Sequence, residues 1–325
     1  MKAIVYDSYG PPEVLKLKEM PKPIPGPREV LIRVKAATVT TGDCNIRGFT
    51  YIPPGFGIIP RLMFGFRKPG KQILGTELSG VVVETGASVS LFKPGDEVFG
   101  IGSAYLGAYA EYVCRPESSA LIHKPVTLSY ETAASLSFGG LTALYFLQKA
   151  KIKPGESVLV RGASGGVGLI TVQLARYFGA CVTGICSAEK GSIVRSTGAE
   201  TVLDYKDPDY QSQLKKYDII VDTVVGHNSF CDMRKLLNPG GRYCSVAGGP
   251  KEMLQMMLTS VAGNKKVIFG SPQERKAELH FLADLVSKGQ LQLFIDKSFP
   301  LEETAIAHEY FESGVKMGQV VINVS

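Results

Sequence analysis

Four glycines between residues 162 and 168 could let the backbone approach a ligand closely. They follow the apolar run Ser157–Arg161, which is typical of a parallel strand buried on both faces. Apolar residues then recur at three- and four-residue steps up to Gly179, which predicts a helix. Because the free amides that open a helix bind anions, this order predicts a dinucleotide site. Its contacts are expected from Ala163, Ser164, Gly165, Gly166 and Val167.

The elements on either side of this segment indicate an α/β chain with two domains. Short apolar runs separated by proline and glycine turns fill the first 120 or so residues and predict a small antiparallel β-barrel. From Ser129 onwards helices and strands alternate, with helices expected at 130–149 and near 209–216, which predicts a parallel sheet covered by helices. Strands return around a helix at about 302–312. We therefore expect a substrate domain at 1–122 with 289–325, a nucleotide-binding domain at 123–288, and a substrate cleft between them.

The composition is that of an ordinary globular protein. Among 325 residues, 45% are hydrophobic and 20% charged, and the net charge of +6 is spread along the chain, which argues against nucleic acid as a partner. The six cysteines form no C-x-x-C pair, and the four histidines are scattered and expected at the surface or at its boundary. With no signal-peptide core and no membrane-length apolar run, a cytoplasmic protein without integral membrane contact is expected.

Several motifs in order give the chain its resemblance to a known family. GPPEVLKL, ILGTELSGVV, FKPGDEVFG, GAYAEY, LSYETAASLSFGGLTA, GASGGVG and GRYCSVAG resemble the medium-chain dehydrogenase/reductase superfamily, and most of all its zinc-free quinone oxidoreductase branch, which includes zeta-crystallin. The resemblance covers nearly the whole chain. It implies a GroES-like domain beside a Rossmann domain, NADPH as cofactor, and a homodimer.

The end of the second strand of the nucleotide-binding domain bears on the choice of cofactor. An acidic residue there would favour NAD, whereas this strand, CVTGIC, ends before Ser187. Similar reductases hold the 2′-phosphate of NADPH with a hydroxyl, a lysine and a tyrosine, and the matching residues are Ser187, Lys190 and Tyr205. NADPH is the expected cofactor. NADH stays open, because a small shift in register would bring Glu189 to the ribose.

The positions that hold catalytic zinc in related enzymes read Thr40, Thr76 and Phe138 here, and none of them is a zinc ligand. Without a Lewis acid, oxidation of a simple alcohol lacks its main source of charge stabilisation. Quinones and α,β-unsaturated carbonyl compounds need less help, because the charge left by hydride addition spreads into the conjugated system. We therefore expect a small hydrophobic conjugated carbonyl compound as substrate.

The resemblance also implies residues around the nicotinamide. It should lie between the domains near Thr142, Val246 and Ala247. Thr142 could equally be a mid-helix threonine bonded to its own helix. Thr40 replaces a family asparagine and is a candidate for polarising the substrate, while Tyr51 and Tyr105 are candidate proton donors. Asp43 keeps the family's acidic position, with catalysis and a structural salt bridge both open.

Two segments stand apart from these motifs. Residues 49–72 are rich in proline, glycine and aromatic residues, and they could form a substrate lid, a loop drawn to anionic lipid, or a loop packed on its own domain. The methionine-rich run after Pro250 could line a pocket or face a dimer partner. Two other functions remain open: an enoyl-thioester reductase, and a catalytically idle NADPH-binding sensor or structural protein.

Overall fold

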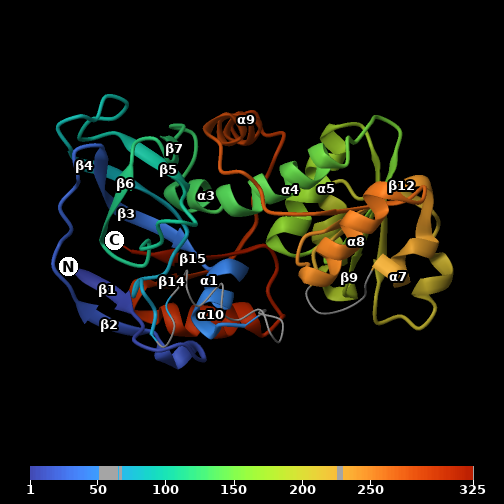
Figure 1. Cartoon of the computed structure of the whole chain (residues 1–325), viewed down its shortest axis with the longest axis horizontal. Helices are drawn as coiled ribbons and strands as arrows, with labels where there is room; N and C mark the ends of the chain where they lie inside the picture. The colour runs from blue at the N-terminus through green and yellow to red at the C-terminus, as the bar shows by residue number, and fades with distance from the viewer. Residues whose placement is uncertain (51–64, 66–67, 225–229, 325) are drawn as a thin grey trace. The chain divides into compact units, whose positions relative to one another are not determined.

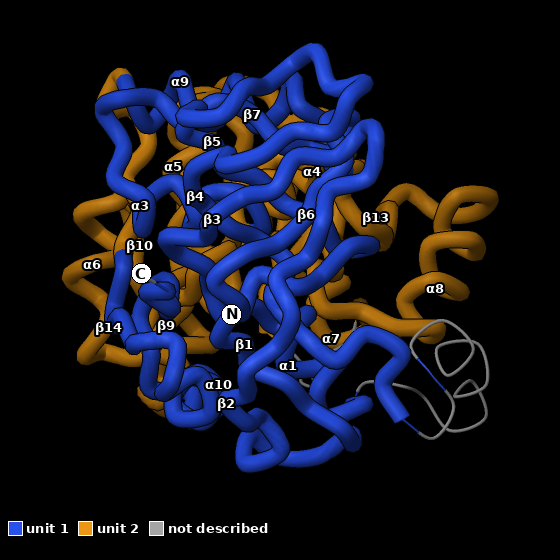
Figure 2. Tube along the Cα trace, turned by 90° about the vertical axis from the view of Figure 1, so that its left-hand side faces the viewer, with its two compact units in different colours: residues 1–138, 274–287, 295–325 blue, residues 139–273, 288–294 orange. Residues whose placement is uncertain are grey.

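The computed structural model describes residues 1–50, 65, 68–224 and 230–324. They form two compact units, shown in blue and orange in Figure 2. Unit 1 comprises 1–138, 274–287 and 295–325, and unit 2 comprises 139–273 and 288–294. The domain boundaries proposed from the sequence, after residues 122 and 288, stay predictions. No helix in the described part of the chain is long and apolar enough to cross a membrane.

Unit 1 is built on a seven-stranded mixed sheet with the order β14-β15-β3-β4-β5-β7, in which β6 also pairs with β3 (Figure 1). The ladders are antiparallel except for β14 with β15. The strands are β3 (Glu29–Thr38), β4 (Glu77–Thr85), β5 (Glu97–Ile101), β6 (Tyr112–Pro116), β7 (Ala120–His123), β14 (Ile295–Pro300) and β15 (Gln319–Asn323). A separate hairpin pairs β1 (Lys2–Val5) with β2 (Lys16–Glu19).

The β-rich character of unit 1 is confirmed, but the closed barrel expected from the sequence is not formed by the described strands. Their pairings run from β14 to β7 without meeting. One physical reason is that β6 branches from β3 rather than extending the row. The core on this sheet gathers alternate residues of β3 and β4 with Tyr6, Tyr109 and residues of the helix α10 (Thr304–Glu312).

Other helical elements of unit 1 lie among its described residues. They are η1 (Pro12–Val14), α1 (Thr41–Gly48), α3 (Tyr130–Ala134) and α9 (Lys276–Ser287), and a short turn, η5 (Leu301–Glu303), leads into α10. The expected helix at 130–149 is divided into two helices. α3 ends at Ala134, and α4 (Ser137–Lys149) begins at Ser137. Ser135 Oγ donates to the Glu131 carbonyl at 2.8 Å, and such back-bonding competes with the helix ladder.

Unit 2 contains a six-stranded sheet in the order β10-β9-β8-β11-β12-β13, and every pair in it is parallel. The strands are β8 (Ser157–Arg161), β9 (Cys181–Cys186), β10 (Thr201–Asp204), β11 (Tyr217–Asp222), β12 (Leu237–Ser245) and β13 (Lys266–Phe269). Numbered from β8, this order is 3-2-1-4-5-6, the doubly wound arrangement of dinucleotide-binding sheets. The expected parallel sheet is confirmed.

Helices connect these strands. They are most of α4, α5 (Gly166–Tyr177), α6 (Gly191–Ser196), α7 (Phe230–Met233) and α8 (Pro250–Val261), with the short turns η2 (Ala188–Lys190), η3 (Tyr210–Gln213) and η4 (Arg234–Leu236). The helix expected near 209–216 is only the turn η3. On α8, Met256 packs on the core of unit 2, whereas Met253, Leu254, Met257 and Leu258 are exposed.

Candidate active site

The glycine segment forms a tight turn between β8 and α5. Gly162 has φ +70°, a left-handed conformation that suits glycine. A Cβ at Gly168 would lie 2.2 Å from the Gly162 carbonyl oxygen, so the turn packs against the first helical turn only without a side chain there. At Gly165, φ is −78° and the nearest atom to an added Cβ would be 3.5 Å away. The protein itself therefore does not require glycine at 165, and the space beside it is open.

This turn lies at the point where the strand order of the sheet reverses. β8 is flanked by β9 on one side and by β11 on the other, and ligands of doubly wound sheets bind outside the carboxyl ends at this switch point. Just beneath it, Asp222 at the end of β11 accepts from the Arg161 guanidinium and, at 2.8 Å, from Tyr243 Oη. Burial raises the pKa of Asp222 while Arg161 opposes that shift. These contacts join the ends of β8 and β11 to β12 under the turn.

The residues proposed for the 2′-phosphate lie together at the ends of β9 and β10. The Tyr205 amide donates to the Cys186 carbonyl at 3.2 Å, which places Tyr205 beside Ser187. Ser187 is buried, Tyr205 is exposed, and Lys190 ends η2. Glu189 also lies here, where Lys206 Nζ is 3.2 Å from its carboxylate. A hydrogen bond from Ser187, together with Lys206, lowers the pKa of Glu189 to about 2.

Lys206 was not singled out by the sequence reasoning. It directly follows Tyr205, so its place in the LDYKD run was the available signal. What the sequence could not show is its ion pair with Glu189, seventeen residues away. The ends of β9 and β10 therefore carry a paired carboxylate and two lysines.

The remaining cofactor candidates occupy other parts of unit 2. Val246 and Ala247 form the turn after β12, and the Val246 amide donates to the Asp222 carbonyl at 3.0 Å. Thr142 lies in α4 and is 4% exposed, and its Oγ1 has no hydrogen-bond partner among the described residues. The alternative in which this hydroxyl bonds to its own helix is therefore not seen. An unpartnered buried hydroxyl is costly and marks a position that a ligand could satisfy.

In unit 1, Thr40 belongs to a buried polar cluster rather than to an open surface. It caps α1, its Oγ1 accepting from the Asp43 amide at 3.1 Å and donating to Asp43 Oδ2 at 2.6 Å. Thr76 Oγ1 lies 3.5 Å from both Thr40 Oγ1 and Asp43 Oδ2. Asp43 also accepts from the Gly75 amide at 3.1 Å, and burial raises its pKa to about 6. The salt bridge considered for Asp43 is not formed with any described residue.

Glu77 is a second buried carboxyl group, and the sequence reasoning overlooked it. It accepts from the Thr38 hydroxyl and, at 2.6 Å, from the Phe138 amide. Burial raises its pKa to about 8, so the carboxyl group holds a proton near neutral pH. Its position directly after Thr76 in GTELSG was the only signal in the sequence.

The two tyrosines proposed as proton donors have different outcomes. Tyr51 lies outside the described residues, as does most of the 49–72 segment. Tyr105 is exposed in the loop after β5, with the Lys71 ammonium 5.9 Å from its ring centroid. Among the described residues, Tyr105 and Thr40 share no hydrogen bond.

The expected surface position of the histidines is wrong for His308. This residue of α10 is fully buried, with Nδ1 2.9 Å from Arg47 Nη1 and Nε2 3.1 Å from Tyr109 Oη. Burial and the neighbouring Arg47 lower its pKa to about 3, which keeps the imidazole neutral. Among the described residues, no three His, Cys, Asp or Glu side chains gather as a metal site would require.

Two known domain families match the chain. Residues 26–126 match the alcohol dehydrogenase GroES-like domain, and residues 197–322 match a family described as zinc-binding dehydrogenase. The first match covers most strands of the unit 1 sheet, and the second covers β10 to β15.

Full-length relatives agree with these matches. A quinone oxidoreductase of Rattus norvegicus is 33% identical, over 99% of this chain and 97% of its own length. A solved quinone oxidoreductase of Coxiella burnetii superposes with a TM-score of 0.89 at 32% identity, covering 100% of this chain and 99% of the other. A quinone oxidoreductase of Escherichia coli, solved with NADPH, has a TM-score of 0.81 at 27% identity and full coverage of both chains. This chain belongs to the medium-chain dehydrogenase/reductase superfamily of oxidoreductases, in its quinone oxidoreductase branch.

Proposed function

We propose that the protein is a zinc-independent reductase that uses NADPH to transfer hydride to quinones or to other α,β-unsaturated carbonyl compounds. The observation that carries the proposal is the Thr40–Asp43–Thr76 cluster, which presents hydroxyl groups at positions where zinc enzymes of the family carry metal ligands. Threonine hydroxyls are not zinc ligands. Acceptors that delocalise their own negative charge are the substrates that this arrangement favours.

NADPH suits the residues of unit 2. The open space beside Gly165 at the start of α5 can admit a pyrophosphate to the helix amides. Ser187, Lys190, Tyr205 and Lys206 offer hydroxyls and positive charge for a 2′-phosphate. The NADPH bound to the E. coli relative supports the same choice. Once bound, the reduced nicotinamide supplies the hydride.

The chain's own groups would position the reactants and hold protons. The unpartnered Thr142 Oγ1 is a hydrogen-bonding group for the cofactor. In unit 1, Asp43 orients the Thr40 hydroxyl, and Glu77 keeps a proton on its carboxyl group near neutral pH. We propose Thr40 as the group that polarises the substrate carbonyl, which requires its hydroxyl proton to turn from Asp43 to the substrate. Tyr51 and Tyr105 are the candidates for delivering a proton. The cleft predicted between the domains and the predicted homodimer stay predictions.

The test is to mix purified protein with NADPH and follow its absorbance on adding a quinone or an enone. We expect oxidation of NADPH that a zinc chelator does not reduce, and no turnover of aliphatic alcohols with NADP⁺. Zinc-dependent alcohol oxidation would contradict the proposal. Binding of NADPH without oxidation by any acceptor would instead indicate the idle sensor, and a saturable preference for an enoyl thioester over the free enone would indicate the thioester reductase.

Glu189 decides between the two nicotinamide cofactors. In the described structure the Glu189 carboxylate forms an ion pair with Lys206, so the 2′-phosphate of NADPH must compete with that carboxylate for the lysine. If the site serves NADPH, Glu189→Gln removes a repulsive charge and should lower the Kd of NADPH several-fold. If the site serves NADH through Glu189, the same change should weaken NADH by about tenfold instead. Titration of both cofactors against wild type and variant separates the two outcomes.

A further inference from the structure

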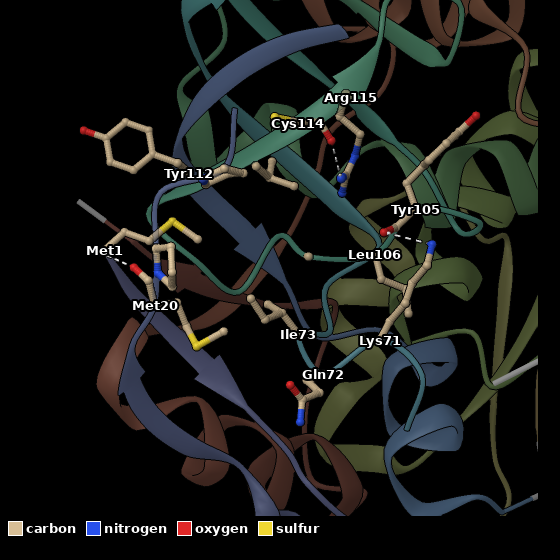
Figure 3. A pocket seen from close by; sticks show the side chains of 14 residues that line it. Met1, Met20, Lys71, Gln72, Ile73, Tyr105, Leu106, Tyr112, Cys114 and Arg115 are labelled. Atoms are coloured by element: carbon tan, nitrogen blue, oxygen red, sulfur yellow. Dashed lines mark hydrogen bonds between the residues drawn. The ribbon is translucent and has the colours of Figure 1, made fainter. Parts of the chain in front are cut away.

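Unit 1 contains a pocket of about 360 Å³, and Tyr105 is the one residue named in the proposed function that lines it (Figure 3). This volume lies within the usual range of about 300–1,000 Å³ for small-molecule sites. One wall is apolar and is formed by Met1, Met20, Pro21, Pro23, Ile73 and Val113. The other side carries Lys71, Tyr105 and Arg115.

Arg115 is the unusual member of this lining. It lies on β6, where the alternation of the strand buries it with Val113, and it is only 3% exposed. Its Nη1 donates to the Cys114 carbonyl at 3.1 Å, but Nη2 has no hydrogen-bond partner among the described residues. A buried guanidinium is normally paired with a carboxylate, because desolvation of its charge is costly.

The nearby acidic groups do not fill this role. Glu274 and Glu29 raise the pKa of Arg115 only in part against burial, which lowers it to about 10. Neither forms an ion pair with Arg115 in the described structure. Glu274 instead accepts from the Ser103 amide at 3.0 Å, and Glu29 from the Gly26 amide at 2.9 Å. Arg115 therefore lines the pocket with a buried charge that no carboxylate of the described residues pairs with.

Lys71 adds a second cation to the same pocket. Its Nζ donates to the carbonyls of Ala104 and, at 3.3 Å, Tyr105, which are neutral acceptors. Burial and then the charge of Arg115 lower the pKa of Lys71, so the two groups are close enough to repel each other. Figure 3 shows the Arg115 side chain extending from β6 toward the side where Lys71 and Tyr105 lie. Two like charges beside one cavity are stabilised when an anion sits between them.

We propose that this pocket binds an organic carboxylate with an apolar body. The carboxylate would accept from Lys71 Nζ and, once the Arg115 side chain turns toward the pocket, from Arg115 Nη2. The apolar body would cover Met20, Pro23 and Ile73. Charge-assisted hydrogen bonds of this kind are about twice as strong as neutral ones. The proposal does not depend on the nicotinamide cofactor or on the reaction of the protein.

The test uses octanoate as the probe, titrated into the full chain by calorimetry without any cofactor. We expect saturable binding of octanoate and much weaker binding of octanamide, which has the same apolar body without the charge. Inorganic phosphate should also bind more weakly, because it leaves the apolar wall uncovered. If octanamide binds as tightly as octanoate, the cations do not contribute to binding. If phosphate binds as tightly as octanoate, the apolar body does not contribute.

Two substitutions locate the site. Lys71→Met and Arg115→Met should each weaken octanoate binding about 10- to 100-fold, as expected for the loss of a charge-assisted hydrogen bond. Lys68→Met is the matched control, because Lys68 is an exposed lysine three residues away that does not line the pocket. If Arg115→Met fails to fold, Lys71→Met and the octanamide comparison still decide. Wild-type affinity in Lys71→Met, or no saturable binding to the wild type, would refute the proposal.

Discussion

Adding a methyl group at Gly168 or at Gly165, the two glycines at the start of α5, should affect different properties. At Gly168 it should lower stability, and at Gly165 it should weaken NADPH binding. At residue 168 a Cβ would lie 2.2 Å from the Gly162 oxygen and 2.8 Å from the Ala163 Cα, and both are backbone atoms that cannot swing aside. Overpacking of this kind costs about 1–3 kcal/mol. The better helix propensity of alanine returns about 1 kcal/mol at most. We expect Gly168→Ala to lower the free energy of unfolding by about 1–2 kcal/mol.

At residue 165 the added Cβ meets only the Gly162 oxygen, at 3.5 Å, and φ of −78° is ordinary for alanine. Because Gly165 is the N-cap of α5, where alanine is less favourable than glycine, the free energy of unfolding should fall by less than about 1 kcal/mol. The methyl group would instead occupy the open space in front of the α5 amides. Losing one charged hydrogen bond to a phosphate there costs about 1.5–3 kcal/mol, which raises the Kd of NADPH about 10- to 100-fold.

Urea unfolding and NADPH titration of both variants measure these two quantities separately. The reasoning predicts a stable Gly165→Ala variant that binds NADPH poorly, and a less stable Gly168→Ala variant. Wild-type NADPH affinity in Gly165→Ala would show that the pyrophosphate does not lie against this turn. An equal loss of stability in both variants would show that the space beside residue 165 is not open in solution.

Three further substitutions test other parts of the site. Lys206→Ala should raise the KM for NADPH about tenfold and leave that for NADH nearly unchanged, as steady-state kinetics with both cofactors would show. Thr142→Val removes a buried hydroxyl that has no partner, so urea unfolding should show equal or greater stability, up to about 1 kcal/mol, while NADPH binding weakens. The pKa of Glu77 is raised to about 8, so folding takes up a proton and stability should fall as pH rises from about 4.5 to 8; Glu77→Gln should flatten that part of the profile of unfolding free energy against pH.

Local sequence patterns were enough for the strand, turn and helix formed by β8, the glycine segment and α5. The apolar run Ser157–Arg161, the glycines and the periodic helix residues all lie within one stretch of chain, so strand, turn and helix could be predicted together. The same approach failed at 130–149, where the continuous helical pattern is divided into α3 and α4 at Ser135. It also failed for the barrel of unit 1, because branching of β6 from β3 depends on pairing between distant segments.

Local patterns also could not predict which polar residues pair within the sites, because the partners come from distant segments of the chain. Arg161 meets Asp222, and Glu77 meets the Phe138 amide, each across 61 residues. The sequence shows that such residues are polar, but not that they are buried or with what they pair. Lys206 and Arg115 were overlooked because a lone basic residue on a strand or turn is ordinary. Lys206 matters because the Glu189 carboxylate competes for it, and Arg115 matters because no carboxylate of the described residues pairs with it.

In unit 1, the charge of the buried Asp43 carboxyl group influences the pKa of the second buried carboxyl group, that of Glu77. Burial raises the pKa of both Asp43 and Glu77, and the charge of Asp43 raises that of Glu77 further. Asp43 is held by hydrogen bonds from Thr40 and Gly75, which favour its ionised form and keep its pKa near 6. Since Asp43 ionises first, its charge makes the proton on Glu77 harder to remove. Glu77 is therefore the carboxyl group of the two that keeps its proton to higher pH, while the hydrogen bonds from Thr40 and Gly75 favour the anionic form of Asp43.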